Sequence, residues 1–153
     1  MEISRVTPWI VDAPPVDPDP PAPDAATPRG PGRQYVFVQV DTDEGITGWG
    51  EITTAGQVAY RSVCAALREL APLVVGQDAS QIEAIWQRVF RAYTYVGTRG
   101  VATVALSGLD IALWDIRGKA LGLPIYQLLG GPVREAIALY THFPYGSTPE
   151  ETG

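Results

Sequence analysis

The sequence predicts an α+β fold, in which a three-stranded antiparallel meander is followed by a helical bundle. Two segments in which apolar and polar residues alternate flank a glycine turn, a pattern that is typical of a β-hairpin. Three later segments repeat apolar residues at the spacing of an α-helix. With 153 residues, the chain is long enough for one domain with a single core.

The expected strands cover residues 2–11, 35–41 and 46–52. Pro8 cannot donate a hydrogen bond to a neighbouring strand, so we expect the first strand to lie at an edge of the sheet or to contain a bulge. Gly45 supplies the positive φ angle that a tight hairpin turn requires between the second and third strands. In the third strand, Trp49 is expected in the core.

Residues 12–33, between the first two strands, are dominated by Pro, Asp, Ala and Gly. Such a composition buries little apolar surface, and it predicts an extended, mobile loop. Arg29 and Arg33 are the only cations in this loop, so they are the residues to test if the loop contacts an anionic substrate. The alternative is an acidic loop that is merely solvated.

The first helix is predicted over residues 56–70 and is expected to stop before Pro72. Thr54 and Gln57 have the spacing of a capping box, in which each side chain bonds to the backbone N–H of the other residue. Thr54 is therefore the predicted start of this helix.

The second helix is predicted to follow a second capping box, formed by Ser80 and Glu83. Its apolar residues recur at i, i+3, i+4, i+7, i+8 and i+11, namely Ile82, Ile85, Trp86, Val89, Phe90 and Tyr93. This is the clearest amphipathic pattern in the chain, and a turn over residues 93–100 is expected after it.

The third and longest helix ends at residue 121 and is the expected centre of the fold. Its small residues allow a neighbouring backbone to approach closely, and Gly108, which weakens a helix interior, is best explained by such packing. Asp115 and Lys119 lie one turn apart and predict an ion pair on the surface. Gly122 provides a left-handed cap, and Pro124 can begin a further short helix.

Composition excludes several classes of function. The formal net charge is −6 and the isoelectric point is about 4.6, which argues against nucleic acid or an anionic membrane as a partner. The single cysteine, Cys64, excludes an internal disulfide and a thiolate metal cluster, and it is expected to be a buried, inert thiol. Without a membrane-spanning apolar run or a signal-peptide core, we expect a cytoplasmic protein.

Residues 105–130 resemble the signature of the mandelate racemase and muconate lactonising enzyme group of the enolase superfamily. The matching positions are Ala105, Ser107, Gly108, Asp110, Ala112, Trp114, Asp115, Gly118, Lys119, Pro124, Leu128, Leu129 and Gly130. The resemblance implies an enolase-like N-terminal capping domain over residues 1–132. Residues 133–153 would then begin a (β/α)8 barrel, with its first strand at 135–142 and the rest of the barrel outside this chain.

In that family the loop between the first two strands closes over the barrel mouth and helps to select the substrate. A second specificity loop would include Thr53 and Thr54, close to Glu51, although a role at a helix N-terminus is an equal alternative. His142 would lie near the carboxyl end of the first barrel strand, where barrel active sites form, or else be a solvated residue. The predicted substrate-binding residues are thus Arg29, Arg33, Thr53, Thr54 and His142.

The resemblance also implies a chemistry. Family members remove a proton alpha to a carboxylate and hold the resulting enediolate on a divalent metal, usually Mg²⁺. The barrel supplies the base and the metal ligands, so this chain alone is expected to have no catalytic residue, bind no metal and be inert. Asp110 and Asp115 lie in one helix, which favours hydrogen-bond or ion-pair roles over metal binding.

Residues 95–100 and the sequence after them look most like acid-sugar dehydratases of the galactonate or gluconate type. Those enzymes remove water from a sugar acid and give a 2-keto-3-deoxy acid. The expected partner is therefore a small sugar acid bound through the barrel, and the full-length protein is expected to be a homo-oligomer. The alternatives are a racemase, epimerase or cycloisomerase of the same superfamily, a non-enzymatic interaction module, and an unrelated small α+β domain.

Overall fold

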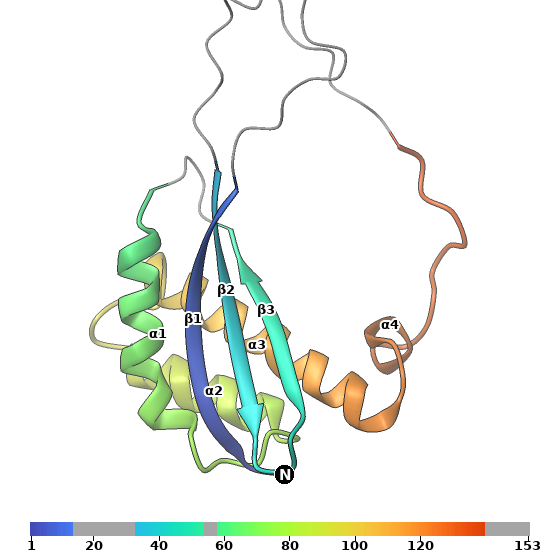
Figure 1. Ribbon diagram of the computed structural model, residues 1–153, viewed down its shortest axis with the longest axis horizontal. Helices are drawn as coiled ribbons and strands as arrows, with labels where there is room; N and C mark the ends of the chain where they lie inside the picture. Colours follow the sequence, from blue (N-terminus) through green and yellow to red (C-terminus); the bar gives the residue numbers. More distant parts are fainter. Residues whose placement is uncertain (14–32, 54–57, 140–153) are drawn as a thin grey trace, which may run out of the picture.

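The computed structural model describes residues 1–13, 33–53 and 58–139. Its elements follow the predicted order of three strands and then helices: β1 (Ile3–Ala13), β2 (Arg33–Thr42), β3 (Thr47–Ile52), α1 (Tyr60–Val74), α2 (Ile82–Ala92), α3 (Val101–Leu121) and α4 (Ile125–Leu128). The sheet forms one layer; in the view of Figure 1, α2 and α3 lie behind it and α1 lies to the left of β1. The predicted α+β fold is confirmed. No helix in the described part of the chain is long and apolar enough to cross a membrane.

The sheet is an antiparallel meander with the strand order β1-β2-β3. Pro8 lies in β1, which is an edge strand as predicted, and it is paired with Val38 of the central strand. At the hairpin between β2 and β3, Gly45 has a φ angle of 80°. The hydroxyl group of Thr42 accepts a hydrogen bond from the N–H of Ile46 at 3.0 Å, which closes the turn.

Side chains alternate across the central strand, so Val36, Val38 and Val40 are fully buried against the helices. The same alternation in β3 contradicts the prediction that Trp49 belongs to the core. Trp49 is 45% exposed and points to the outer face of the sheet, because its two neighbours, Gly48 and Gly50, occupy the inward positions.

Those inward glycines are needed because α3 packs directly on β3. A Cβ atom at Gly48 would overlap the carbonyl oxygen of Ala112, and one at Gly50 would overlap the carbonyl oxygen of Gly108. A Cβ atom at Gly108 would in turn overlap the side chain of Ile52 and approach Val38 to 2.9 Å. The predicted close contact around the small residues of the third helix is therefore confirmed, and its partner is the backbone of a strand.

The first helix differs from its prediction at both ends. It begins at Tyr60, after Ala59 with a φ angle of 66°, and it continues through Pro72 to Val74. Thr54 and Gln57, which were expected to cap it, lie outside the described residues. Pro72 cannot donate a hydrogen bond to the carbonyl of Arg68, and the burial of Leu70 and Val74 on either side of it favours continuation of the helix despite that loss.

The second helix has the predicted amphipathic face but not the predicted cap. Ile82, Ile85 and Val89 are buried. The hydroxyl group of Ser80 donates a hydrogen bond to Asp78 at 2.9 Å, and no side chain caps the helix at Gln81. Asp78 competes successfully for Ser80 because it lies two residues away in the same turn.

The third helix ends as predicted. Gly122 takes the left-handed conformation with a φ angle of 65°, and the N–H of Leu123 donates to the carbonyl of Gly118 at 3.0 Å. Pro124 then precedes α4. Residues 131–139 form neither helix nor strand, which differs from the strand expected over 135–142, and His142 lies outside the described residues. A strand needs a neighbour to bond its backbone groups, and the described part of the chain places none beside this segment.

Candidate functional site

Two of the predicted substrate-binding residues, Arg33 and Thr53, lie at one end of the sheet. β1 ends at Ala13, which is paired with Arg33 at the start of β2, and β3 ends at Ile52 beside the same end of β2. The backbone of Arg33 and the residue after β3, Thr53, are therefore brought to one end of the sheet, at the top of Figure 1. Arg29, Thr54 and His142 lie outside the described residues.

Polar groups line this end of the sheet. The side-chain amide of Gln34 donates a hydrogen bond to Asp12 at 2.6 Å and thereby joins the ends of β1 and β2. Thr53 is exposed, and its hydroxyl group can both donate and accept a hydrogen bond. This arrangement suits contact with a hydroxylated ligand, and we call it the loop end of the sheet.

The position of β3 is fixed by two charged side chains of α3. The carboxylate of Asp115 accepts hydrogen bonds from the backbone N–H of Trp49 at 2.8 Å and from the Lys119 ammonium group at 2.6 Å. Lys119 also donates to the carbonyl of Thr47 at 2.7 Å. The predicted ion pair is confirmed, and it binds backbone groups along the open edge of β3, the strand that leads to Thr53.

Sequence reasoning did not find this contact with β3, because spacing within a helix says nothing about what lies beside the pair. A partial signal exists in the two glycines of the third strand. Gly48 and Gly50 have the strand period of two, and they match the small residues Gly108 and Ala112 of the helix. This match could have indicated that the strand and the helix are in direct contact.

The described residues do not fit a metal site. Within residues 1–13, 33–53 and 58–139, no three His, Cys, Asp or Glu side chains gather as metal ligands would. The carboxylate of Asp115 is occupied by Lys119 and by the strand backbone. Burial, together with the charge of Glu83, raises the pKa of Asp110.

Cys64 is buried in α1, as predicted. Burial raises the pKa of its thiol, although the charge of Arg68 opposes this effect. A thiol with a raised pKa forms little of the reactive thiolate, which agrees with a structural role.

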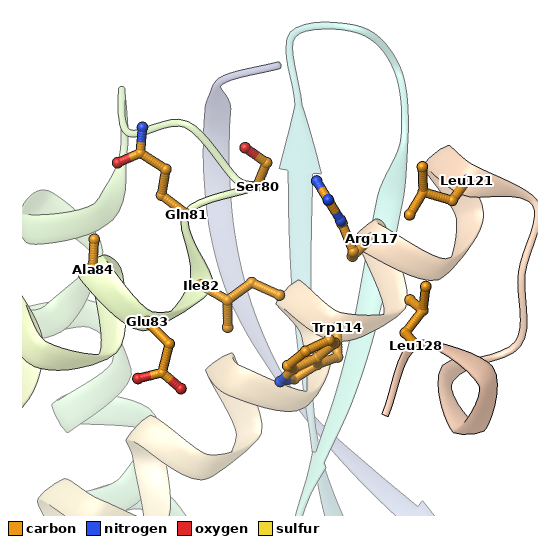
Figure 2. A pocket seen from close by; sticks show the side chains of 9 residues that line it. All are labelled: Ser80, Gln81, Ile82, Glu83, Ala84, Trp114, Arg117, Leu121 and Leu128. Atoms are coloured by element: carbon orange, nitrogen blue, oxygen red, sulfur yellow. The ribbon is translucent and has the colours of Figure 1, made fainter. Parts of the chain in front are cut away.

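A hollow of about 520 Å³ lies between the start of α2, the second half of α3 and α4 (Figure 2), away from the loop end of the sheet. Its lining residues are Ser80, Gln81, Ile82, Glu83, Ala84, Trp114, Arg117, Leu121 and Leu128. None of the predicted substrate-binding residues is among them. The hollow and the loop end of the sheet are therefore separate features.

Comparison with known proteins identifies the family. Residues 12–130 match the family model described as mandelate racemase / muconate lactonizing enzyme, N-terminal domain. The chain is 50% identical over 107 residues to a D-galactonate dehydratase of Xanthomonas campestris pv. campestris, and this match covers 70% of the chain but only 27% of that dehydratase. The chain thus spans about a quarter of the length of such relatives.

Solved structures agree with this assignment. The 3,6-anhydro-D-galactonate cycloisomerase of Zobellia galactanivorans is 28% identical with a TM-score of 0.69, over 86% of this chain and 32% of that one. An isomerase from Streptomyces coelicolor is 31% identical with a TM-score of 0.68, over 87% of this chain and 32% of that one. With its three-stranded meander, its glycine contact between β3 and α3 and these matches, the chain belongs to the mandelate racemase and muconate lactonizing enzyme family of the enolase superfamily, whose N-terminal domain it carries.

Proposed function

We propose that this chain is the capping, substrate-specificity part of a Mg²⁺-dependent acid-sugar dehydratase. The observation that carries the proposal is the 50% identity over 107 residues to a D-galactonate dehydratase. The family match over residues 12–130 is to an N-terminal domain, so together the two matches support a shared role in substrate selection. It supports the reaction less directly, because the relatives carry most of their length outside the matched stretch.

The proposed reaction removes the proton alpha to the carboxylate of a sugar acid and expels the hydroxyl group of the next carbon as water. The enol that remains becomes a 2-keto-3-deoxy acid, so no oxidant or reductant is needed. When bound, Mg²⁺ would stabilise the charge that develops on the carboxylate oxygens. The described residues do not fit that ion, so we assign both the metal and the base to the barrel that follows the cap in full-length relatives.

This chain's own contribution would be substrate selection at the loop end of the sheet. Arg29 and Arg33 would bind the carboxylate of the substrate, and Thr53 and Thr54 would bind its hydroxyl groups. The bonds from Asp115 and Lys119 to β3 support the assignment of Thr53, because they hold the strand that leads to it. His142 would face the substrate from the first barrel strand.

We further propose the domain division implied by the resemblance, with the cap at residues 1–132 and the first barrel strand within 133–153. The family match, which ends at residue 130, supports this boundary. In the complete protein, residues 135–142 would gain the neighbouring strands that they need to form a strand. We expect the complete protein to be a homo-oligomer, which light scattering would test.

The test is a fusion protein in which residues 1–132 of this chain replace the matching part of the Xanthomonas campestris dehydratase. With D-galactonate and Mg²⁺, we expect the fusion protein to form the 2-keto-3-deoxy acid and the 153-residue chain alone to form none. Activity of the chain alone would contradict its inertness. A folded fusion protein that dehydrates no sugar acid would contradict the proposed specificity role.

A second candidate reaction is isomerisation. The similarity to the cycloisomerase of Zobellia galactanivorans favours it, although at 28% identity this support is weaker than that of the dehydratase match. Offering 3,6-anhydro-D-galactonate to the same fusion protein would not decide the matter, because the barrel would be that of a dehydratase. The decisive measurement is a competition assay in which several sugar acids compete for binding to the fusion protein and to the parent enzyme. The sugar acid whose affinity is higher for the fusion protein than for the parent enzyme is the one that this cap prefers.

A further inference from the structure

We propose that the face of the sheet turned away from the helices, which we call the outer face, binds an uncharged, linear oligosaccharide. Two tryptophans on this face, Trp9 of β1 and Trp49 of β3, would each stack on one sugar ring, and Gln39 of β2 would bind the ring between them. The inference goes beyond the proposed function and does not depend on it, because it concerns this face and not the loop end of the sheet.

Both indole rings lie on the outer face. In the strand pairing, Trp9 lies opposite Phe37 of β2. Trp49 lies opposite Gln39 of the same strand, and Phe37 and Gln39 both alternate with the buried valines. Trp9 is 49% exposed and Trp49 is 45% exposed, and in Figure 1 their face is turned to the viewer, with α2 and α3 behind the sheet. An exposed aromatic patch of this kind commonly marks a binding surface.

A network of side-chain hydrogen bonds fixes the polar groups of the outer face. The indole N–H of Trp9 donates to the side-chain oxygen of Gln39 at 2.9 Å, and the amide of Gln39 donates to Asp41 at 2.9 Å. The hydroxyl group of Thr47 donates to the same carboxylate at 2.8 Å, and Arg5 pairs with it at 2.8 Å. Because the edge of the Trp9 ring is bonded to a side chain of the adjacent strand, the ring lies along the sheet with one side open to solvent. The outer face is therefore pre-organised, which lowers the entropic cost of binding.

The spacing of the two tryptophans fits a chain of pyranose rings. Neighbouring strands lie about 4.8 Å apart, so Trp9 and Trp49, which are separated by one strand, are about 10 Å apart in the direction across the strands. A pyranose ring in a linear chain is roughly as long as the distance between neighbouring strands. Three successive rings would therefore cover β1, β2 and β3, with the outer two on the tryptophans and the middle one on Gln39.

The chemistry of the outer face also fits a sugar. One side of a pyranose ring carries C–H groups that stack on an indole ring, and its rim carries hydroxyl groups that donate and accept hydrogen bonds. The side chains of Gln39, Asp41 and Thr47 supply donors and acceptors beside the tryptophans. The charge of Arg5 is compensated by Asp41, so the face has no excess positive charge that would attract an acidic sugar. These groups therefore favour an uncharged saccharide.

A second copy of the chain fits the outer face less well. Two half-exposed indole rings offer roughly 200 Å² of aromatic surface, whereas a stable protein interface buries about 800 Å² on each partner. Glu51, which lies opposite Phe37, adds a negative charge to this face, and a second copy would bring the same charge. The area and the charge thus favour a small, uncharged ligand.

The test is isothermal titration calorimetry of the 153-residue chain with cellohexaose, a linear and uncharged hexasaccharide. We expect cellohexaose to bind, and we expect cellobiose, whose two rings cannot reach both tryptophans, to bind roughly tenfold more weakly or less. Trp49→Ala should weaken the binding of cellohexaose by roughly tenfold, because one stacking contact is lost. Tyr95→Ala is the matched control, since Tyr95 is a fully exposed aromatic residue in the turn after α2, and its loss should leave the affinity unchanged.

No heat of binding with cellohexaose at millimolar concentration would overturn the proposal, and so would equal affinities of the Trp49→Ala chain and the unmodified chain. Equally tight binding of an oligogalacturonate would contradict the uncharged class of ligand. A dimer, seen by light scattering, that Trp49→Ala dissociates would assign the face to a second copy and overturn the proposal too. The comparison of cellohexaose with cellobiose uses the unmodified chain, so it decides the matter even where a variant does not fold. Because this binding needs no catalysis, an inactive fusion protein contradicts only the proposed function.

Discussion

Gly108 shows how one residue decides the distance between two elements. A side chain at this position must displace Ile52 and Val38, both of which are fixed in the sheet. The sequence predicted a close contact here from the cost of a glycine inside a helix, but it could not name the contacting atoms. Those atoms belong to β2 and β3, more than 50 residues away in the chain, and no local pattern reports contacts at that separation.

We expect Gly108→Leu to lower the free energy of unfolding by about 3 kcal/mol, at the upper end of typical overpacking costs, because the added atoms overlap strand side chains. Urea denaturation measures this loss. Ser107→Leu is the control, since Ser107 is exposed on the same helix and its substitution should change the free energy by less than about 0.5 kcal/mol. Equal effects of the two variants would show that α3 does not rest tightly on the strands.

The raised pKa of Asp110 predicts that the stability of the chain depends on pH. Burial and the charge of Glu83 raise its pKa above the ordinary value of 3.8, so the folded state holds the proton more tightly than the unfolded state. The protonated carboxyl group of Asp110 contributes favourably to the free energy of unfolding below pH 3.8, and this contribution is lost as the pH rises through the pKa of the folded state. Asp110→Asn should therefore raise the free energy of unfolding at pH 7 but give no comparable gain at pH 3, as measured by urea denaturation.

Asp41 provides a control of opposite sign. Although burial acts to raise its pKa, hydrogen bonds from Gln39, Thr47 and Arg5 hold the pKa below its ordinary value. Its stabilisation is present above pH 3.8 and is lost as the pH falls through the folded pKa. Asp41→Asn should accordingly destabilise the chain at pH 7 and have less effect in acid. A gain at neutral pH in both variants would contradict this account.

At the scale of whole elements, side chains of α3 bond to the backbone along the edge of β3 that no strand covers. Asp115 and Lys119 bond to the backbone of Trp49 and Thr47, as a neighbouring strand would otherwise do. We expect Asp115→Ala to remove the hydrogen-exchange protection of the Trp49 amide and to lower the free energy of unfolding by about 1 kcal/mol.

Glu69→Ala is the control for that substitution, because Glu69 is an exposed carboxylate in α1 and should leave the Trp49 amide protected. If the amide of Trp49 exchanged at the same rate in both variants, the bond from Asp115 would not hold the strand. In the fusion protein, Asp115→Ala should also raise the KM for the sugar acid more than it lowers kcat, since Thr53 would be less well positioned.

The elements also show which sequence signals were reliable. Periodicity located all three long helices and all three strands, because one face of each element is buried against the same core. The predicted caps were less reliable, as Ser80 bonds to Asp78 rather than to the start of α2. A capping pattern specifies only which bonds are available, and the neighbouring turn decides which of them form.

At the scale of the whole molecule, the sequence predicted the fold and the family, whereas the site remains a proposal. The family resemblance depended on closely spaced small and charged residues in α3, and the structure explains these residues by contacts with β3. Of the predicted site residues, only Thr53, which follows β3, and the backbone of Arg33, at the start of β2, belong to the described residues. Loop sequences carry little periodicity, so their arrangement around a substrate could not be predicted.

The two edge strands of the sheet, β1 and β3, are protected against pairing with other chains. Open strand edges are the usual sites at which separate chains join and aggregate. Here, Pro8 leaves the edge strand β1 without one backbone donor, and the Asp115–Lys119 pair binds backbone groups along the open edge of β3. Once this domain has folded, both edge strands of its sheet are therefore protected against pairing with strands of neighbouring molecules.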